Sequence, residues 1–566
     1  MRYVGKMTQE TEETTEDCPI LRPWRNSFAD CADWEAPIAT GTLPALLDSA
    51  AASFGDDPVI TFRGRHIGFR ALRDHADRVA AGLLRMGVGP GQSVALYLPN
   101  TPWHPVAFFA LARTGARIVH LSPLDAPREL AHKLHDSGAR LLIATNLPGM
   151  LPMALGLLEK GAVARLLIGE DAAWGPSPAA QAVPWGAHVQ PIPEADPPPS
   201  WPLVTPDDIA LLQYTGGTTG LPKGAMLTHG NLTAAVSIYR NWHEGARADP
   251  NRRHRVIAVL PLFHIYALTV VLLGSVALGH EMLLHPRFDV AEVLDDICVK
   301  RATWFPGVPT MWIALANHPD AANCDFSSLA LASSGGAPMP FDVEQRVTRL
   351  VGSRLGGGWG MTETSPAGTR IPAAAEPAPG LIGIPLPGID LAMVDRTDPG
   401  RFLPPGEIGE LAVRGPNVFR GYWNKPEETR AAFHDGFFLT GDIGVMDARG
   451  LFRLLDRKKN MIISGGFNVY PTAIEAAIYE HPAVAEVIVI GIPDEYRGQA
   501  AKAFVTLKPG AAPFAIEELK TFLADKLGRH EIPAALEFRE SLPRSPAGKL
   551  LAQALRDEEN AKHAAT

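Results

Sequence analysis

A short loop rich in glycine, threonine and lysine has the composition of a polyphosphate site. It runs from Tyr214 to Gly224 and contains four glycines, three threonines and one lysine. Glycine lets backbone N–H groups approach an anion, threonine hydroxyls donate hydrogen bonds, and the lysine ammonium adds positive charge. We therefore expect the loop to bind the phosphates of a nucleoside triphosphate. It differs from the G-x-x-x-x-G-K-[ST] pattern, because Pro222 precedes Lys223 and a glycine follows it.

Two further glycine-rich segments offer groups for the rest of a nucleotide. Ser333–Pro338 is a turn of small residues after an apolar run, which would let a flat ring lie against the backbone. Gly356–Thr364 presents Trp359, then Thr362, then Glu363. These residue types suit stacking, phosphate contact and Mg²⁺ ligation.

The elements that must position these residues alternate in type. Short β-branched runs predict strands at 59–62, 94–98, 118–121 and 209–212, and amphipathic segments predict helices at 69–86 and 106–113. Such alternation predicts an α/β fold with a large N-terminal domain of β-α-β units and mixed or parallel sheets. The strand at 209–212 leads directly into the Gly/Thr loop.

A second, smaller region begins near Asp456. Strands are predicted at 484–490, 503–507 and 535–538, with a helix at 516–527. Thr472 and Glu475 have capping-box spacing, so a helix is expected directly after Pro471. We therefore predict a disordered leader at 1–17, a large domain at 18–455, a hinge at 456–459 and a small, mobile α+β domain at 460–566.

Composition narrows the classes of function. The chain has 566 residues and a net charge of -9, which argues against general nucleic-acid binding. Its four cysteines show no C-x-x-C pair, so thiols in a reducing compartment, and hence a cytoplasmic protein, are expected. The apolar stretch Ile265–Gly279 is too short to span a membrane and predicts a buried helix. Peripheral membrane contact and a homodimer stay open.

The motifs together resemble the adenylate-forming superfamily, in its acyl-CoA synthetase (fatty-acid/acyl-CoA ligase) branch. Five segments match in the expected order, at 214–229, 335–338, 359–364, 440–475 and 543–549. Trp359 departs from the family pattern, since tyrosine usually stands there. The indole could stack on adenine or belong to the core.

The resemblance implies a role for each matching residue. The residues expected to bind ATP are Thr215, Gly216, Gly217, Thr218, Thr219 and Lys223 at the β- and γ-phosphates, Gly335, Gly336, Ala337, Pro338, Trp359, Gly360 and Met361 around the adenine, and Asp442 with Arg457 at the ribose. Those expected to act in the reaction are Glu363 as the Mg²⁺ ligand, Thr362 at the α-phosphate, and Lys549 as the adenylation lysine.

The implied chemistry has two steps. A carboxylate attacks the α-phosphorus of ATP to give an acyl-adenylate, and Mg²⁺ and Lys549 offset the repulsion between the two anions. A thiol then displaces AMP after the small domain rotates about Lys459. Gly465 and Gly466 would line the CoA channel, while His264 and Val308 would contact the acid.

The expected reaction is therefore ATP-dependent acyl-CoA formation, with ATP, Mg²⁺ and CoA as cofactors and co-substrate. The match favours medium- or long-chain fatty or dicarboxylic acids. Two alternatives remain: a coumarate-like aryl-acid CoA ligase, and a stand-alone adenylation enzyme that loads a carrier protein. A non-catalytic nucleotide sensor is disfavoured, because the charged residues of the motifs are all present.

Overall fold

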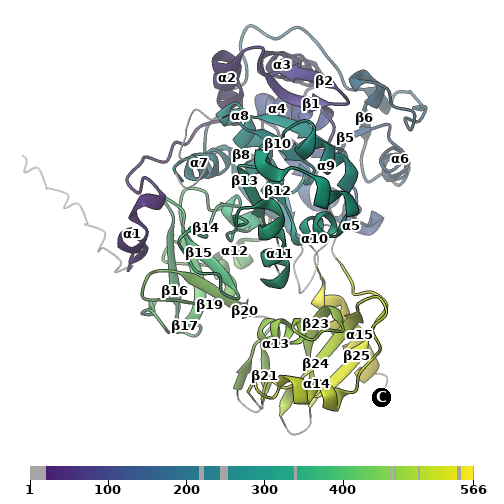
Figure 1. The fold of residues 1–566 in the computed structure, drawn as a ribbon. Helices are drawn as coiled ribbons and strands as arrows, with labels where there is room; N and C mark the ends of the chain where they lie inside the picture. Colours follow the sequence, from purple (N-terminus) through teal and green to yellow (C-terminus); the bar gives the residue numbers. More distant parts are fainter. Residues whose placement is uncertain are drawn as a thin grey trace, which may run out of the picture.

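The computed structural model describes residues 21–215, 222–242, 253–336, 339, 341–458, 460–464, 467–494, 497–528, 530–544 and 550–564. Figure 1 shows a large part, coloured purple to green, and a smaller part at the C-terminal end, coloured yellow. The predicted fold class is confirmed, because the large part holds mixed sheets built from β-α-β units and the smaller part holds a mainly antiparallel sheet.

The first sheet carries the start of the Gly/Thr loop. Its strand order is β7 (Val189–Pro191), β6 (Arg165–Gly169), β5 (Leu141–Thr145), β3 (Ser93–Leu96), β4 (Arg117–His120), β8 (Ile209–Thr215) and β9 (Lys223–Thr228). The pairs are parallel except for β8 with β9. The predicted strands at 94–98, 118–121 and 209–212 all lie in this sheet.

A second sheet forms the other half of the β-α-β region. Its order is β13 (Leu331–Ser334), β12 (Trp304–Gly307), β10 (Arg255–Ala258), β11 (Glu281–Leu284), β1 (Pro58–Phe62) and β2 (Arg65–Gly68). It is parallel except for β1 with β2.

Helices join and cover these two sheets. They are α2 (Leu43–Phe54), α3 (Phe69–Arg85), α4 (Trp103–Thr114), α5 (Pro127–Ser137), α6 (Leu151–Glu159), α7 (His229–Arg240), α8 (Gly274–Leu278), α9 (Val290–Cys298), α10 (Pro309–Asn317) and α11 (Phe341–Val351). The short helix α1 (Trp24–Ser27) lies elsewhere, and its Trp24 packs against Phe452 with ring centroids 6.0 Å apart. Helix α4 is mainly apolar and is buried along its whole length, where it packs against α2, α3, β3 and β4. It forms the centre of the largest hydrophobic core.

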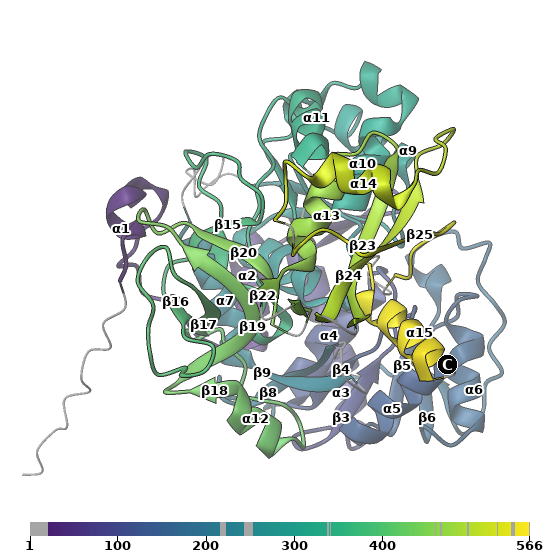
Figure 2. The ribbon, with the colours of Figure 1, turned by 90° about the horizontal axis from the view of Figure 1, so that it is seen from below.

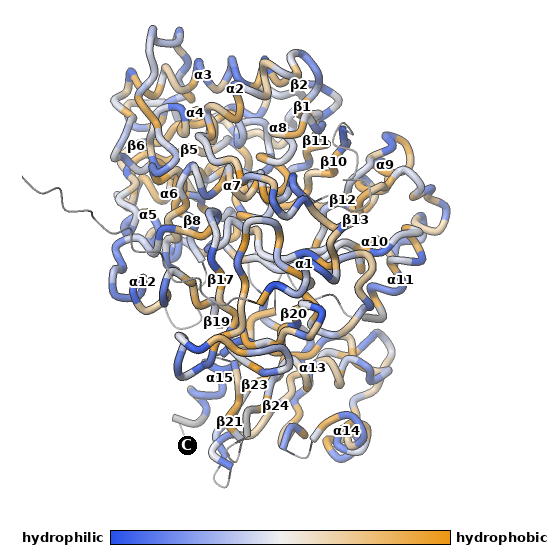
Figure 3. Tube along the Cα trace, turned by 90° about the vertical axis from the view of Figure 1, so that its left-hand side faces the viewer, coloured by the Kyte–Doolittle hydropathy of each residue, from blue (hydrophilic) through white to orange (hydrophobic). Residues whose placement is uncertain are grey.

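A third, antiparallel sheet follows in the chain. Its order is β14 (Thr369–Arg370), β15 (Leu381–Pro385), β20 (Phe452–Arg457), β19 (Phe437–Met446), β17 (Ile408–Arg414) and β16 (Asp390–Val394), with β18 (Phe433–His434) beside β19. Helix α12 (Pro426–Ala432) precedes β18, buries none of its residues and is coloured hydrophilic in Figure 3.

The C-terminal sheet has helices on both faces. Its order is β22 (Phe467–Val469), β21 (Ile462–Ser464), β24 (Gly498–Leu507) and β23 (Val484–Asp494), with β25 (Ala535–Phe538) parallel to β24. Helices α13 (Pro471–Tyr479) and α14 (Ile516–Leu523) lie on one side and α15 (Ala552–Ala564) on the other, as Figure 2 shows. Successive side chains of β23 point to opposite faces of the sheet. Val487 and Val489 pack in the core on one face, and Ile488 and Ile490 pack in the core on the other.

The predicted capping box of α13 is wrong, although the helix does begin at Pro471. No side chain caps its N-terminus locally. Thr472 instead bonds Asp456, and Oε1 of Glu475 accepts the backbone N–H of Val489 at 2.7 Å. Tertiary partners have replaced the local ones.

The apolar stretch at 265–279 is a buried helix, as predicted. It consists of a π-helical segment, η4 (Ala267–Leu273), followed by α8. Within the described part of the chain, no helix is both long and apolar enough to cross a membrane.

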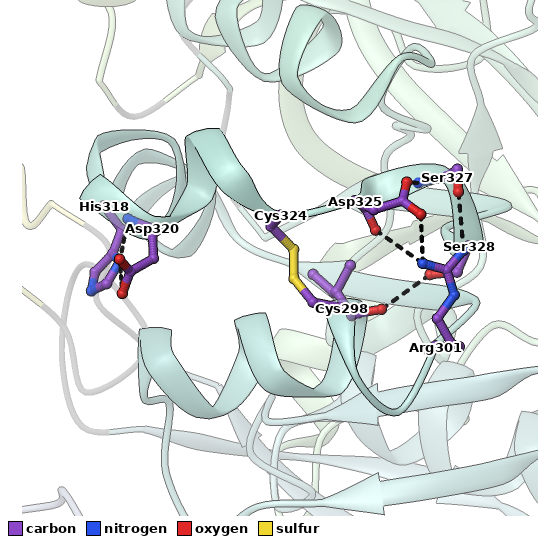
Figure 4. The surroundings of a disulfide bond; sticks show 9 residues. Cys298, Arg301, His318, Asp320, Cys324, Asp325, Ser327 and Ser328 are labelled. Atoms are coloured by element: carbon purple, nitrogen blue, oxygen red, sulfur yellow. Dashed lines mark hydrogen bonds and ion pairs between the residues drawn. A yellow bond between two sulfur atoms is a disulfide. The ribbon is translucent and has the colours of Figure 1, made fainter.

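The prediction that the cysteines are unpaired thiols is wrong for two of them. Cys298 at the end of α9 is joined to Cys324, with a Cα–Cα distance of 5.6 Å (Figure 4). Arg301 of the α9–β12 turn forms an ion pair at 2.7 Å with Asp325, the residue that follows Cys324. Cys31 is buried in the main core.

Candidate active site

The Gly/Thr loop starts and ends at one place on the first sheet. Thr215, the last residue of β8, is paired with Lys223, the first residue of β9. Both side chains are half-buried. The predicted phosphate ligands Gly216, Gly217, Thr218 and Thr219 lie outside the described residues.

Lys223 lies near the predicted metal ligand, and a tyrosine stands between the two. The Lys223 ammonium is 5.3 Å from the ring centroid of Tyr422. The Tyr422 hydroxyl donates a hydrogen bond of 2.9 Å to Oε1 of Glu363. Sequence reasoning missed Tyr422, because a lone tyrosine after a glycine carries no signal of its own.

The Glu363 carboxyl group is deeply buried. It lies in the short 3₁₀ turn η7 (Thr362–Thr364), which also places Thr362, and is only 5% exposed. Burial raises the pKa of Glu363 above its ordinary value, and the Tyr422 hydrogen bond partly opposes this shift. A buried carboxylate of this kind suits Mg²⁺, which proteins commonly bind through one or two carboxylates together with substrate phosphates. No cluster of three or more metal-ligating side chains occurs among the described residues.

The turn that carries Glu363 depends on glycine and on one asparagine. A Cβ atom at Gly360 would lie 1.5 Å from the carbonyl oxygen of Pro366, so only glycine fits there. The Asn417 side chain donates to the carbonyl oxygens of Thr364 and Ala367 at 2.6 and 2.7 Å. The turn, which also includes Met361, is therefore held from both sides.

A second buried carboxylate lies beside this turn. Asp442 of β19 is 2% exposed and is paired in register with Arg457 of β20. Its Oδ1 lies 2.8 Å from Nε of Arg457, and its Oδ2 accepts a 2.8 Å hydrogen bond from Nε1 of Trp359. Trp359 is 9% exposed and belongs to the main core. Of the two interpretations of this indole, the structure favours core packing, with the added task of orienting Asp442.

The predicted adenine segment lies against an aromatic ring. A Cβ atom at Gly335 would be 3.1 Å from the Tyr266 ring, and Gly336 has φ of +78°, which favours glycine. Val308 caps α10 at the end of the neighbouring strand β12. Ala337 and Pro338 lie outside the described residues.

A small cavity lies behind these two turns. Its volume is about 20 Å³ and its lining residues are Val236, Tyr239, Thr269, Val270, Gly274, Leu278 and Trp304. The Trp304 indole reaches Oγ of Ser333 at 3.4 Å, and the Tyr239 hydroxyl lies 3.5 Å from the Pro366 carbonyl oxygen. The cavity is therefore close to both the Ser333–Gly336 turn and the Met361–Pro366 turn.

The loop that carries His264 is held by buried amides. Asn100 accepts from the backbone N–H of Leu262 at 2.9 Å and donates to the carbonyl of Leu260 at 2.9 Å. Gln213 of β8 donates to the carbonyl of Phe263 at 3.0 Å and in turn contacts His120 of β4 at 3.1 Å. Burial lowers the pKa of His120 to about 4, so this contact is between neutral groups at pH 7. His264 itself is half-buried, and its Nδ1 accepts the Tyr266 N–H at 3.3 Å.

The described part of the predicted hinge, residues 456–458, is bonded to both parts of the molecule. The Lys458 ammonium pairs with the buried Glu410 carboxylate at 2.8 Å, and its backbone N–H donates to Gly441 at 2.8 Å. Asp456 accepts from the backbone and hydroxyl of Thr472 in α13, at 2.8 and 2.9 Å.

The remaining predicted residues are not placed. Lys459, Gly465, Gly466 and Lys549 lie outside the described residues.

Known proteins resemble the chain over nearly its whole length. The family described as AMP-binding enzyme matches residues 47–423, and the AMP-binding enzyme C-terminal domain matches residues 473–549. A long-chain-fatty-acid–CoA ligase of Bacillus subtilis (strain 168) is 37% identical over 96% of this chain and 99% of its own length. A feruloyl-CoA synthase of an Amycolatopsis species is 37% identical over 86% of this chain and 93% of its own. The crystal structure of ATP-bound MatB from Rhodopseudomonas palustris has a TM-score of 0.77 and 30% identity, and covers 91% of this chain and 98% of that one.

Proposed function

We propose, starting from the fact that this chain belongs to the family of AMP-binding enzymes, that it activates a medium- or long-chain fatty or dicarboxylic acid for transfer to CoA. The chain is an acid–thiol ligase of the AMP-forming type, and it works through an acyl-adenylate. ATP, Mg²⁺ and the co-substrate CoA are the cofactors of adenylate-forming CoA ligases.

One observation carries the proposal. Lys223, Glu363 and Asp442 come from three distant segments, and the connections through Tyr422 and Trp359 bring all three to one site. Bringing buried carboxylates and a cation together has a desolvation cost, which a structural role alone does not require. Binding a metal–nucleotide complex gives this arrangement a use.

The roles proposed for these residues follow their chemistry. Thr215 and Lys223 hold the β- and γ-phosphates, and the Asp442 carboxylate, held by Arg457, accepts hydrogen bonds from the ribose hydroxyls. Glu363 is the proposed ligand of Mg²⁺, which when bound offsets phosphate charge during attack at the α-phosphorus. Thr362, next to it in the same turn, contacts the α-phosphate.

The roles of the undescribed residues rest on the motif match alone. Lys549 assists adenylation, Lys459 is the hinge of the small domain, and Gly465 and Gly466 line the CoA channel. Lys549→Ala should slow acyl-AMP formation about 10²- to 10³-fold, as expected for the loss of one preorganised charge. Thioester formation from supplied acyl-AMP should survive, and an equal loss in both half-reactions would contradict the rotation.

The cavity behind the turns has room for about one water molecule, so its lining, rather than its size, supports an apolar acid. Valine, leucine and tryptophan side chains form most of its wall, and His264 and Val308 would contact the acid nearer the reacting carboxylate. The similarity to a fatty-acid ligase points the same way. The feruloyl-CoA synthase supports the aryl-acid alternative, since a flat ring needs less depth than an extended chain.

A screen for pyrophosphate release would decide between the substrates. Fatty, dicarboxylic and cinnamic acids are compared with wild type and with Gly274→Ala, whose added Cβ has room 3.5 Å from Thr269 and narrows the cavity. A fatty-acid ligase should lose its longer substrates in this variant, whereas selective turnover of cinnamic acids by wild type would favour the aryl-acid function. Acyl transfer to a holo-carrier protein but not to CoA would identify the carrier-loading enzyme. A cytoplasmic location, a homodimer and membrane contact stay predictions.

A further inference from the structure

The segment Phe419–Trp423 is bonded to both halves of the candidate site. Its backbone is tied to β9, because Trp423 donates to Gly224 at 2.8 Å and Met226 donates to Gly421 at 2.9 Å. The same segment is tied to the η7 turn, because the Phe419 N–H donates to the Glu363 carbonyl at 2.8 Å. The backbone of this segment therefore fixes β9 and η7 relative to each other.

The Tyr422 side chain uses this position twice. Its hydroxyl donates to Oε1 of Glu363 at 2.9 Å, and its ring face lies 5.3 Å from the Lys223 ammonium. Phe419 packs edge-on against the Tyr422 ring, with centroids 4.8 Å apart, so the ring has little freedom to turn. One rigid aromatic side chain thus contacts both a carboxylate and a cation that the proposed function uses.

We propose that Tyr422 is a positioning residue, whose hydroxyl orients the Glu363 carboxylate for a divalent cation and whose ring orients Lys223 for phosphate. This inference rests on the proposed function for the identity of the nucleotide. A glutamate side chain loses rotamer freedom when it binds a metal, and a hydrogen bond that fixes it beforehand reduces this cost. A cation held over an aromatic face is likewise positioned without being neutralised, so Lys223 keeps its charge for the phosphates.

Two substitutions separate the two tasks. Tyr422→Phe removes the hydroxyl and keeps the ring, and Tyr422→Leu removes both. The matched control is Tyr97→Phe, because Tyr97 is fully buried and its hydroxyl has no hydrogen-bond partner within the described part of the chain. Circular dichroism melting checks that each variant is folded.

The primary measurement is binding rather than turnover. Mn²⁺ affinity is measured by electron paramagnetic resonance in the presence of a non-hydrolysable ATP analogue, and analogue affinity without metal is measured by calorimetry. Tyr422→Phe should weaken Mn²⁺ binding about 10- to 100-fold, as is typical when the partner of a ligating group is lost, and should leave metal-free analogue binding unchanged. Tyr422→Leu should weaken both, and Tyr97→Phe neither.

Other results would overturn the inference. Wild-type Mn²⁺ affinity in Tyr422→Phe would show that the hydroxyl does not orient the metal ligand. An equal loss with and without metal would show a merely structural role. Should Tyr422→Leu fail to fold, Tyr422→Phe still decides, since it keeps the ring. ATP–pyrophosphate exchange that depends on an added acid tests the proposed function of the wild-type enzyme separately. If no acid supported exchange, the proposed function would fail, but the Mn²⁺ affinities would still decide the role of Tyr422.

Discussion

Replacing Trp359 by phenylalanine tests how strongly the indole holds Asp442. The substitution keeps an aromatic ring in the core and removes the Nε1–H that donates to Oδ2 at 2.8 Å. A hydrogen bond to a charged group contributes about 1.5–3 kcal/mol to stability. Because Asp442 is 2% exposed, water cannot replace the lost donor without rearrangement. We expect Trp359→Phe to lower the free energy of unfolding by an amount in this range, in addition to any packing loss.

Trp312→Phe is the matched control for packing. Trp312 is fully buried and its Nε1 donates to a neutral acceptor, the Ser333 carbonyl, at 3.0 Å. Such a bond contributes about 0.5–1.5 kcal/mol. Both variants lose the same atoms from a buried site, so the difference between them, on the order of 1 kcal/mol, isolates the carboxylate. Urea unfolding followed by circular dichroism measures it.

A double-mutant cycle completes the test. In the background of Asp442→Ala, Trp359→Phe should cost only its packing term, because the indole no longer has a carboxylate to bond. Equal losses for Trp359→Phe and Trp312→Phe, or an undiminished cost in the Asp442→Ala background, would refute the reasoning.

Three further outcomes are expected. Burial raises the pKa of Glu475 to about 8 from 4.5, so the folded chain keeps a proton that the unfolded chain releases, and stability falls as pH rises from about 4.5 to about 8. Glu475→Gln has no titrating carboxyl group at this position. The melting temperature of the variant relative to wild type should therefore rise between about pH 4.5 and about pH 8. Melting temperatures that change in parallel with pH would contradict this prediction. Cys298→Ser opens a loop whose ends are 26 residues apart, and should lower stability by about 3.5 kcal/mol without reductant. The difference in unfolding free energy between wild type and Cys298→Ser should vanish in dithiothreitol. A difference that persists there would contradict a stabilising disulfide. Gly335→Ala would place a Cβ 3.1 Å from the Tyr266 ring and, because misplaced groups cost rate, should slow pyrophosphate exchange about tenfold with little change in melting temperature; unchanged exchange would remove this turn from the site.

Residues whose pattern is local were predictable from the sequence. The strands at 94–98, 118–121 and 209–212 lie in one sheet because their apolar runs suit a buried parallel strand. The apolar stretch at 265–279 is a buried helix, as predicted from its length, because 15 residues are too few to span a membrane.

Residues whose role depends on a distant partner were not predictable. Tyr422 acquires its role from a carboxylate 59 positions away, and Gln213 from a carbonyl 50 positions away. Thr472 and Glu475 have capping-box spacing, but Asp456 and Val489 outcompete the local partners once the fold has formed. The Cys298–Cys324 pair shows the same limit, since spacing along the chain does not say which cysteines meet in space.

The bonds around Lys458 decide where the chain can turn. The Lys458 backbone is bonded to β19 and its side chain to β17. The chain up to Lys458 is therefore fixed to the third sheet of the large part. The proposed rotation of the small domain would then take place in the few backbone torsion angles that follow Lys458. Such a rotation would also have to break the two hydrogen bonds that Thr472 of α13 donates to Asp456. Under the proposed rotation, the pivot would therefore be confined to a short segment directly after Lys458.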